Sequence, residues 1–251
     1  VNTAREDSAP AWSPNGLRLA FVADSTFDYT DGSDSELYTS DAQGGALLRL
    51  TRTAELEVAP SWSPDGHRLV YAVVSGLETD APRSEIWIVN ADGTGRQRLS
   101  AAGADDHNPS WSPGGGRIAF SSDRTGNREI YTMNTGGADL RRLTFDADQD
   151  DQPSWSPDGR RIVWASDVET FTGSELYSAG AFNGRDWVRL TRDSFPDGEP
   201  TFSPNGRWIA FSTQCRSGFC EDHEIWRIRS DGTDPRFLAD GISPDWQRLV
   251  P

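Results

Sequence analysis

The chain has 251 residues, a formal net charge of −15 and a sequence pI near 4.5. This acidity argues against nucleic acid and anionic membrane surfaces as partners, because both are bound through basic side chains that release counterions. All 24 basic residues are arginine, which excludes a Schiff-base lysine and the lysine of a phosphate-binding P-loop.

A short element, Pro-x-Trp or Pro-x-Phe, recurs along the chain and divides it into repeats. Its prolines lie at positions 10, 60, 109, 153, 200 and 244, at intervals of 50, 49, 44, 47 and 44 residues. A period in the forties is typical of a four-stranded propeller blade and is longer than the common helical repeats. The repeats contain 10 Trp, 11 Phe and 5 Tyr, which is enough apolar bulk for a packed core.

Four pieces follow one another in each repeat, and each predicts a strand. The Pro-x-Trp piece ends in a turn such as Ser-Pro-Asp-Gly, in which Pro presets φ and Gly or Asn tolerates a positive φ. An apolar run comes next, at 17–23, 67–74, 116–122, 160–166 and 207–213. An alternating run that opens with Glu follows, at 36–41, 85–90, 129–134, 175–180 and 224–229. The last piece lies at 47–51, 96–100, 140–144, 187–191 and 235–239. Together they predict a four-stranded antiparallel meander without helices.

The fourth copy, PSWSPDGRRIVWASD followed by SELY and RLT, resembles the WD40-like (PD40) repeat of the TolB-type β-propeller family. This resemblance implies an all-β fold, with one β-propeller domain over residues 1–251 and aromatic residues packed between blades. Its members are typically six-bladed, extracytoplasmic interaction modules of bacteria, and TolB itself serves in a periplasmic protein complex. We therefore expect a periplasmic or extracellular protein. The five full repeats span about 7–51, 57–100, 106–144, 150–191 and 197–239.

The sixth Pro-x-Trp element has almost nothing after it. Residues 243–249 predict a lone innermost strand, and residue 1 falls just past the place where a fourth strand should finish. We expect a six-bladed ring with five complete blades, whose last blade has its other three strands upstream of a processed or truncated start. A five-bladed ring with 240–251 as a tail is the alternative. A gap in the ring would also expose strand edges, which favour self-assembly or completion by a second chain.

The loops between the second and third strands differ among the copies, whereas the turns between the first and second are nearly uniform. Binding usually lies on variable loops of a rigid scaffold, so the variable face is the expected interaction surface. Aromatic residues in these polar loops either tuck under the loop or anchor a partner, and the candidates are Phe27, Tyr29, Phe171 and Phe219.

An acidic residue stands three residues before each repeat proline: Asp7, Glu57, Asp106, Asp150 and Asp197. Since the first strand of a propeller blade lines the channel, we expect these acids, with His107 beside them, to ring its mouth and bind a ligand. A cation, an arginine or hydrogen bonds must offset their repulsion. Alternatively, each acid accepts hydrogen bonds from backbone amides of its own link. The Glu that opens each third strand belongs to the scaffold, because it recurs in every copy.

Two stretches resemble calcium loops, and Ca²⁺ is the one cofactor that the sequence suggests. The first offers Asp146, Asp148, Asp150 and Asp151, and the second offers Asp28, Asp31 and Asp34. Hard carboxylate oxygens suit Ca²⁺, but the first stretch lacks the Gly at position six and the Glu at position twelve of a calcium loop. Solvated acidic loops are the alternative.

The two cysteines, Cys215 and Cys220, lie close together in one loop. Two cysteines are too few for a structural zinc site, whereas a paired count suits a disulfide in an oxidising compartment. Two reduced thiols are the alternative.

These patterns favour a non-catalytic module that binds a protein or peptide, and the acidity favours a basic partner. No catalytic residue is predicted, because the acids follow the repeat and no Gly-x-Ser-x-Gly elbow is present. A structural subunit of an envelope or extracellular assembly and a glycan-active hydrolase or lyase using channel carboxylates are the alternatives.

Overall fold

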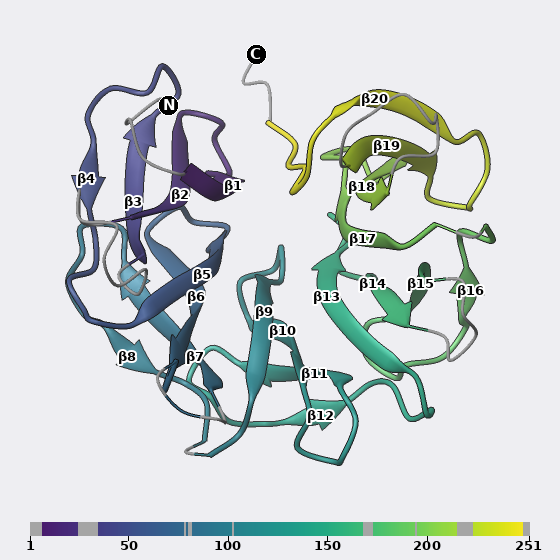
Figure 1. Ribbon diagram of the computed structural model, residues 1–251, viewed down its shortest axis with the longest axis horizontal. Coiled ribbons are helices and arrows are strands. Elements are labelled where there is room, and N and C mark those ends of the chain that lie inside the picture. The colour runs from purple at the N-terminus through teal and green to yellow at the C-terminus, as the bar shows by residue number, and fades with distance from the viewer. Residues whose placement is uncertain are drawn as a thin grey trace.

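The computed structural model describes residues 7–24, 35–77, 79, 82–101, 103–167, 173–193, 195–214 and 223–247. Within these ranges the chain forms twenty strands and no helix. The strands make five antiparallel four-stranded sheets, which are arranged as blades around a central channel (Figure 1). The prediction of an all-β propeller is therefore confirmed.

Each blade consists of four consecutive strands, ordered from the channel outward. Blade 1 is β1 (Asp7–Trp12), β2 (Arg18–Asp24), β3 (Ser35–Asp41) and β4 (Leu48–Arg49). Blade 2 is β5 (Leu56–Trp62), β6 (Arg68–Ser75), β7 (Arg83–Asn90) and β8 (Gln97–Arg98). Blade 3 is β9 (Asp106–Trp111), β10 (Arg117–Ser122), β11 (Glu129–Asn134) and β12 (Arg141–Arg142). Blade 4 is β13 (Gln149–Trp155), β14 (Arg161–Asp167), β15 (Ser174–Gly180) and β16 (Val188–Arg189). Blade 5 is β17 (Asp197–Phe202), β18 (Trp208–Gln214), β19 (His223–Arg229) and β20 (Arg236–Asp240).

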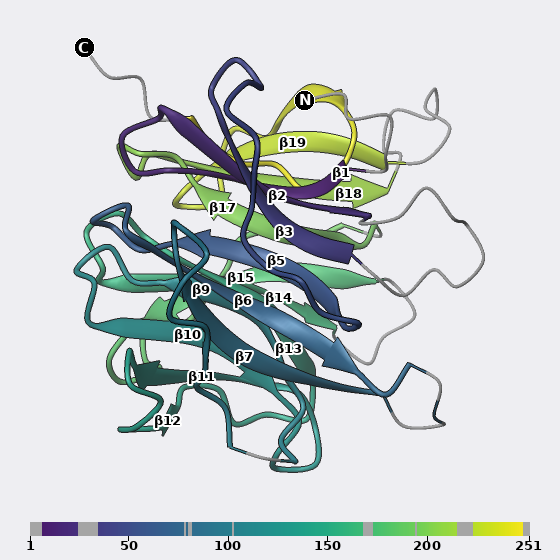
Figure 2. The same ribbon diagram turned by 90° about the vertical axis from the view of Figure 1, so that its left-hand side faces the viewer.

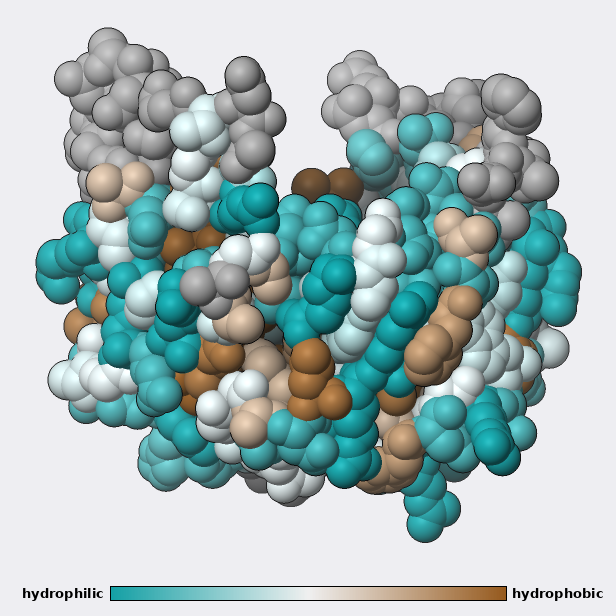
Figure 3. Space-filling view, turned by 90° about the horizontal axis from the view of Figure 1, so that it is seen from below, coloured by the Kyte–Doolittle hydropathy of each residue, from teal (hydrophilic) through white to brown (hydrophobic). Residues whose placement is uncertain are grey.

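The two faces of the ring differ because neighbouring strands are antiparallel. The turns from first to second and from third to fourth strand lie on one side, which we call the turn face (Figure 2). The segments that join one blade to the next reach the other side, which we call the link face. The rim seen in Figure 3 is mostly hydrophilic, with small hydrophobic areas separated by polar side chains.

The core lies between blades rather than within them. One buried cluster joins Val70 and Ile86 of blade 2 to Trp111 and Phe120 of blade 3. The aromatic residue of the repeat acts as a wedge between two blades. The indole of Trp155 in blade 4, for example, donates to the carbonyl of Ser110 in blade 3 at 3.1 Å. Burying a large aromatic side chain stabilises a junction, and the indole N–H groups of Trp62 and Trp155 are also satisfied across theirs.

The segment after β20 follows the course of an inner strand without forming one (Figure 1). Trp246 donates to the carbonyl of Thr201 at 3.2 Å, as Trp155 does to Ser110, so its wedge is in place. However, residues 242–247 form no strand and pair with none among the described residues. The prediction of a lone inner strand at 243–249 is therefore wrong over its described part. Five sheets agree better with the five-bladed alternative than with a partial sixth blade.

Candidate binding site in the central channel

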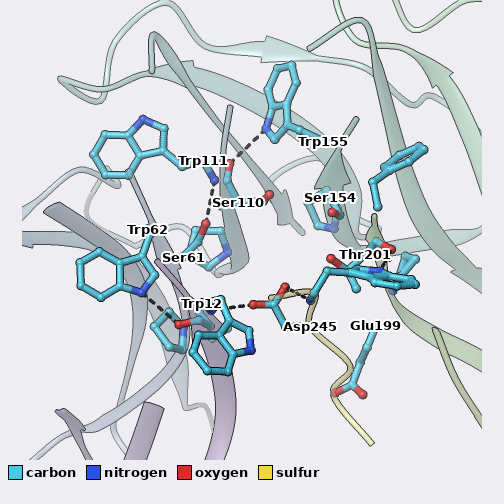
Figure 4. A pocket seen from close by; sticks show the side chains of 18 of the residues that line it. Trp12, Ser61, Trp62, Ser110, Trp111, Ser154, Trp155, Glu199, Thr201 and Asp245 are labelled. Carbon is cyan, nitrogen blue, oxygen red and sulfur yellow. Dashed lines mark hydrogen bonds between the residues drawn. The ribbon is translucent and has the colours of Figure 1, made fainter. Parts of the chain in front are cut away.

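The inner strands enclose a cavity of about 550 Å³, which lies on the side of the turn face because prolines of the first turns help to line it. Figure 4 shows side chains that line this cavity. Its wall is made by the Pro-x-Trp/Phe-Ser-Pro elements of all five blades together with Ser243–Trp246. Every blade contributes one equivalent piece of wall because the element ends each inner strand. The repeat that holds the blades together thus also shapes the cavity.

Each inner strand is interrupted by a β-bulge just before the repeat proline. The residue at that point has a left-handed backbone, with φ between 48° and 57°, although none is glycine. Such a conformation costs about 1–3 kcal/mol per residue and persists where the surrounding structure enforces it. The five residues at the bulges line the cavity, and so does Ser243, which has the same backbone conformation at the equivalent place outside a strand: Ala9, Ala59, Asn108, Gln152, Glu199 and Ser243. The backbone of the cavity wall is therefore strained, and the packing around it fixes its conformation.

A second belt comes from the residue between the proline and the aromatic residue: Ala11, Ser61, Ser110, Ser154, Thr201 and Asp245 (Figure 4). Two of these side chains join neighbouring wall pieces. The hydroxyl of Ser61 accepts the amide of Trp111 at 3.0 Å. The carboxylate of Asp245 accepts the amide of Trp12 at 2.6 Å in the same way. The belt is mostly hydroxyl-bearing and can donate or accept hydrogen bonds.

Two charged side chains line the cavity among the described residues, and both are carboxylates: Glu199 and Asp245. Glu199 accepts the amide of Ser243 at 2.7 Å and its hydroxyl at 2.9 Å. Glu199 in β17 and Trp12 in β1 thus hold the segment 243–246 from opposite sides. Asp245 faces the cavity and is exposed there, but the protein packed around it raises its pKa to about 6. At neutral pH the cavity wall is therefore acidic.

The structure does not gather the predicted acids at the channel mouth. Glu57, Asp106, Asp150 and Asp197 are fully buried at separate blade junctions, and none lines the central cavity. Asp197 borders a second hollow of about 340 Å³ near β17 and β18, together with His223. Asp7 begins β1, and its side chain lies outside the described part of the chain.

Two of the buried acids lie beside an arginine. Asp106 forms an ion pair with Arg124 at 2.6 Å. Glu57 accepts the hydroxyl of Thr53 at 3.0 Å and lies 3.6 Å from Arg96. Burial and the charge of Glu36 nevertheless raise the pKa of Glu57 to about 8. The Glu that opens the third strand pairs with an arginine of the fourth strand in blades 1 to 4: Glu36–Arg49, Glu85–Arg98, Glu129–Arg142 and Glu175–Arg189.

The predicted calcium loop at 146–151 is only partly assembled as expected. Asp146 and Asp150 converge, but on Glu129 rather than on the other two acids, and one carboxylate oxygen of each lies within 4.8 Å of the others. Asp151 instead pairs with Arg128 at 2.6 Å and accepts the side-chain amide Nδ2 of Asn108 at 2.8 Å. Asp148 lies outside the cluster. Burial raises the pKa of Asp150 to about 7, and the nearby hydroxyls of Ser166 and Thr144 offset this only in part.

His107 lies 3.0 Å from the carboxylate of Asp105 and away from the central cavity. The other predicted loop residues fall outside the described ranges, and they are Phe27, Asp28, Tyr29, Asp31, Asp34, Phe171, Cys215, Phe219 and Cys220.

The cavity-lining residues were not predicted from the sequence, because the repeat element was assigned to the scaffold and binding was expected on the face opposite the uniform turns. Sequence variation on either side of the repeat proline could have indicated them. The preceding residue changes from Ala to Asn, Gln, Glu and Ser among the copies, although the proline that follows it is constant. Variation inside a constant element marks positions that the scaffold does not require.

The match to known proteins agrees with this architecture. The PD40 family model, described as the TolB beta propeller domain, matches residues 9–240. The chain belongs to the TolB β-propeller family. No described helix of this TolB-family propeller is long and apolar enough to cross a membrane. A search of curated proteins found no match.

Solved structures share the fold of this TolB-family propeller at low identity. A candidate TolB from Agrobacterium tumefaciens has a TM-score of 0.77 and 23% identity, covering 98% of this chain and 87% of that one. TolB from Acinetobacter baumannii also has a TM-score of 0.77 and 23% identity, covering 96% of this chain and 57% of that one. A chain of a nidogen/laminin complex has a TM-score of 0.70 and 12% identity, covering 92% of this chain and 79% of that one.

Proposed function

We propose that this TolB-family propeller is a non-catalytic module of the periplasm or extracellular space that binds a partner protein by taking a basic peptide segment into the central cavity. The observation that carries the proposal is the cavity itself. It measures about 550 Å³, within the usual range of ligand sites, and its charged lining residues are both acidic.

The wall suits binding because it is rigid and offers hydrogen bonds. Prolines and enforced left-handed residues form it, so little conformational freedom is lost when a segment enters. The serines of the second belt, such as Ser110 and Ser154, supply hydroxyls at the cavity surface (Figure 4). A peptide is a better match than an apolar ligand, because its backbone presents donors and acceptors that these groups can satisfy.

Electrostatics favour a basic segment. Glu199 and Asp245 line the cavity, and the whole chain carries a net charge of −15. Such a field attracts cationic partners and speeds their encounter, and added salt weakens this effect. The same two carboxylates bond the segment 243–246 and β1, which supports a structural use rather than acid–base catalysis. The link face, where the variable loops were predicted to bind, is the competing docking surface.

The proposal is tested by selecting binders from a random peptide library displayed on phage. We expect the selected peptides to be enriched in Arg and Lys and to lose at least tenfold in affinity for Ser110→Tyr, whose ring would fill the cavity. Leu140→Tyr is the matched control, because Leu140 is 46% exposed and lies on the outer edge of blade 3 before β12. Acidic or neutral binders, or binders that ignore Ser110→Tyr, would overturn the proposal.

A further inference from the structure

Buried carboxylates recur at the blade junctions, but their compensation differs from one junction to the next. Between blades 1 and 2, Arg96 and the hydroxyl of Thr53 approach Glu57. Between blades 2 and 3, Arg124 pairs with Asp106 at 2.6 Å. Each of these acids therefore has a cationic neighbour and at least one oxygen with a partner. A buried carboxylate requires such compensation, because desolvation disfavours its charged form.

The junction between blades 3 and 4 has a third carboxylate where the junctions between blades 1 and 2 and between blades 2 and 3 have a cation. Asp150 forms no ion pair with arginine among the described residues, and Asp146 approaches it instead. Asp146 stands at the repeat position that Thr53 occupies in blade 1, so a hydroxyl donor has been replaced by a second anion. Glu129 completes the cluster, and Arg142, which pairs with Glu129, is its one cation within the described ranges. Three carboxylates with one arginine leave a formal deficit of two positive charges.

Unpartnered oxygens point into this cluster. Asp150 is fully buried, and neither of its carboxylate oxygens makes a well-formed hydrogen bond. Glu129 is equally buried, and its second oxygen, Oε2, has no partner either. Glu36 and Glu175 also have an unpartnered Oε2, so the two oxygens of Asp150 are what distinguishes this junction. Ser166, Thr144 and Trp164 lie near Asp150, but the lack of a well-formed hydrogen bond to either oxygen would cost several kcal/mol if nothing else bound them. This observation is independent of the number of acids and indicates a missing ligand.

The geometry fits a cation. Oxygens that coordinate one Ca²⁺ at about 2.3–2.6 Å can lie at most about 5 Å apart, and those of the cluster lie within 4.8 Å of one another. Asp146 is exposed, which leaves a path from solvent, and waters could complete the shell. Ligands on an open, irregular link suit the flexible coordination of Ca²⁺ better than the strict octahedron of Mg²⁺.

We propose that Glu129, Asp146 and Asp150 bind one divalent cation, Ca²⁺ in preference to Mg²⁺, between blades 3 and 4. The ion would join β11 of one blade to the start of β13 in the next. It would thereby stabilise the ring at a junction that has no additional arginine.

The test uses metal-free protein and Tb³⁺ luminescence excited through tryptophan, because Trp164 lies beside Asp150. We expect sensitised emission that Ca²⁺ displaces with an affinity in the range of about 0.1–1 mM, as in extracellular modules. Asp146→Thr restores the residue of blade 1 and should weaken Ca²⁺ at least tenfold. Asp148→Asn, in the same link but outside the cluster, should stay within twofold of the wild type.

Thermal unfolding gives a second readout. Ca²⁺ should raise the Tm of the wild type and of Asp148→Asn but not that of Asp146→Thr, because a ligand stabilises only a state that binds it. The absence of Ca²⁺-displaceable emission in the wild type would overturn the proposal, as would equal weakening by both substitutions. If Asp146→Thr does not fold, the Ca²⁺ titration of the wild type and the Tm shift of the wild type still test whether Ca²⁺ binds.

Discussion

At the scale of single residues, one repeat position shows how an acidic side chain meets a different charged partner in each blade. The acid three residues before the repeat proline has Arg96 beside it in blade 2 and Arg124 in blade 3. The sequence predicted that these acids recur, but their burial and their partners could not be read from it. The reason is that Arg96 precedes β8 whereas Arg124 follows β10, so the cation reaches the junction from a different element each time.

The raised pKa of Glu57 predicts a pH-dependent stability. With an ordinary pKa near 4.5 when unfolded and about 8 when folded, Glu57 holds its proton more tightly in the native state. The stabilisation that Glu57 gives to the folded state is fully present below pH 4.5 and is lost as the pH rises through 8. We expect the free energy of unfolding of the wild type, relative to Glu57→Gln, to fall by about 2 kcal/mol between pH 6 and pH 9.

Urea unfolding of both proteins across this range measures the effect. Glu85→Gln is the control, because Glu85 pairs with Arg98, so its replacement leaves Arg96 beside Glu57 unchanged. An unchanged difference between wild type and Glu57→Gln from pH 6 to pH 9 would contradict the assigned pKa.

At the scale of elements, the turn between third and fourth strand packs against the preceding blade through a glycine. Its φ is positive in blades 2 to 5, and an added Cβ would fall on the carbonyl oxygen of a leucine that ends the blade before. The distances from that Cβ to the oxygen are 3.1 Å for Gly93, 2.5 Å for Gly137, 2.1 Å for Gly184 and 3.0 Å for Gly232. The turns therefore require glycine for two reasons, the backbone conformation and the space.

Gly184→Ala and Gly103→Ala separate these two reasons. Both glycines have a positive φ, but a Cβ at Gly103 would meet nothing within 4 Å. We expect Gly103→Ala to lower the free energy of unfolding by roughly 1 kcal/mol, the cost of a left-handed alanine. Gly184→Ala should cost roughly 3 kcal/mol, because the turn must also move away from Leu143. Chemical denaturation measures both, and equal losses would contradict the close packing.

The strands themselves were predictable, whereas the inner bulges were not. Apolar runs placed the second strand of each blade and alternating runs that open with Glu placed the third, since both patterns are local properties of the sequence. The second strands are buried on both faces rather than alternately. The residue before each repeat proline has a left-handed backbone that its sequence does not favour. A proline favours an extended backbone in the residue before it. Ala59 and Gln152 adopt the left-handed backbone only because the inner strands must bend around the channel.

At the scale of the whole molecule, the repeat period predicted the propeller. The cavity could not be predicted in the same way, because it exists only where all the blades meet. Six equivalent wall pieces surround it, although five belong to sheets and the sixth, Ser243–Trp246, is held by side chains. The similarity of residues 243–246 to the other copies suggested a strand there, since Trp246 packs between blades as the other repeat aromatics do. It could not show that Glu199 and Asp245 would bond this piece in place of strand pairing.

The central claim is that a basic peptide segment binds in the cavity on the turn face. Hydrogen–deuterium exchange with a selected basic peptide tests this most directly, because it shows which backbone amides the peptide protects. We predict protection spread over several blades, at 59–63, 108–112, 152–156 and 199–203, and its loss in Ser110→Tyr. Protection confined to the link face, for example at 173–175, 212–214 and 223–225, would contradict the claim and assign binding to the opposite side of the ring.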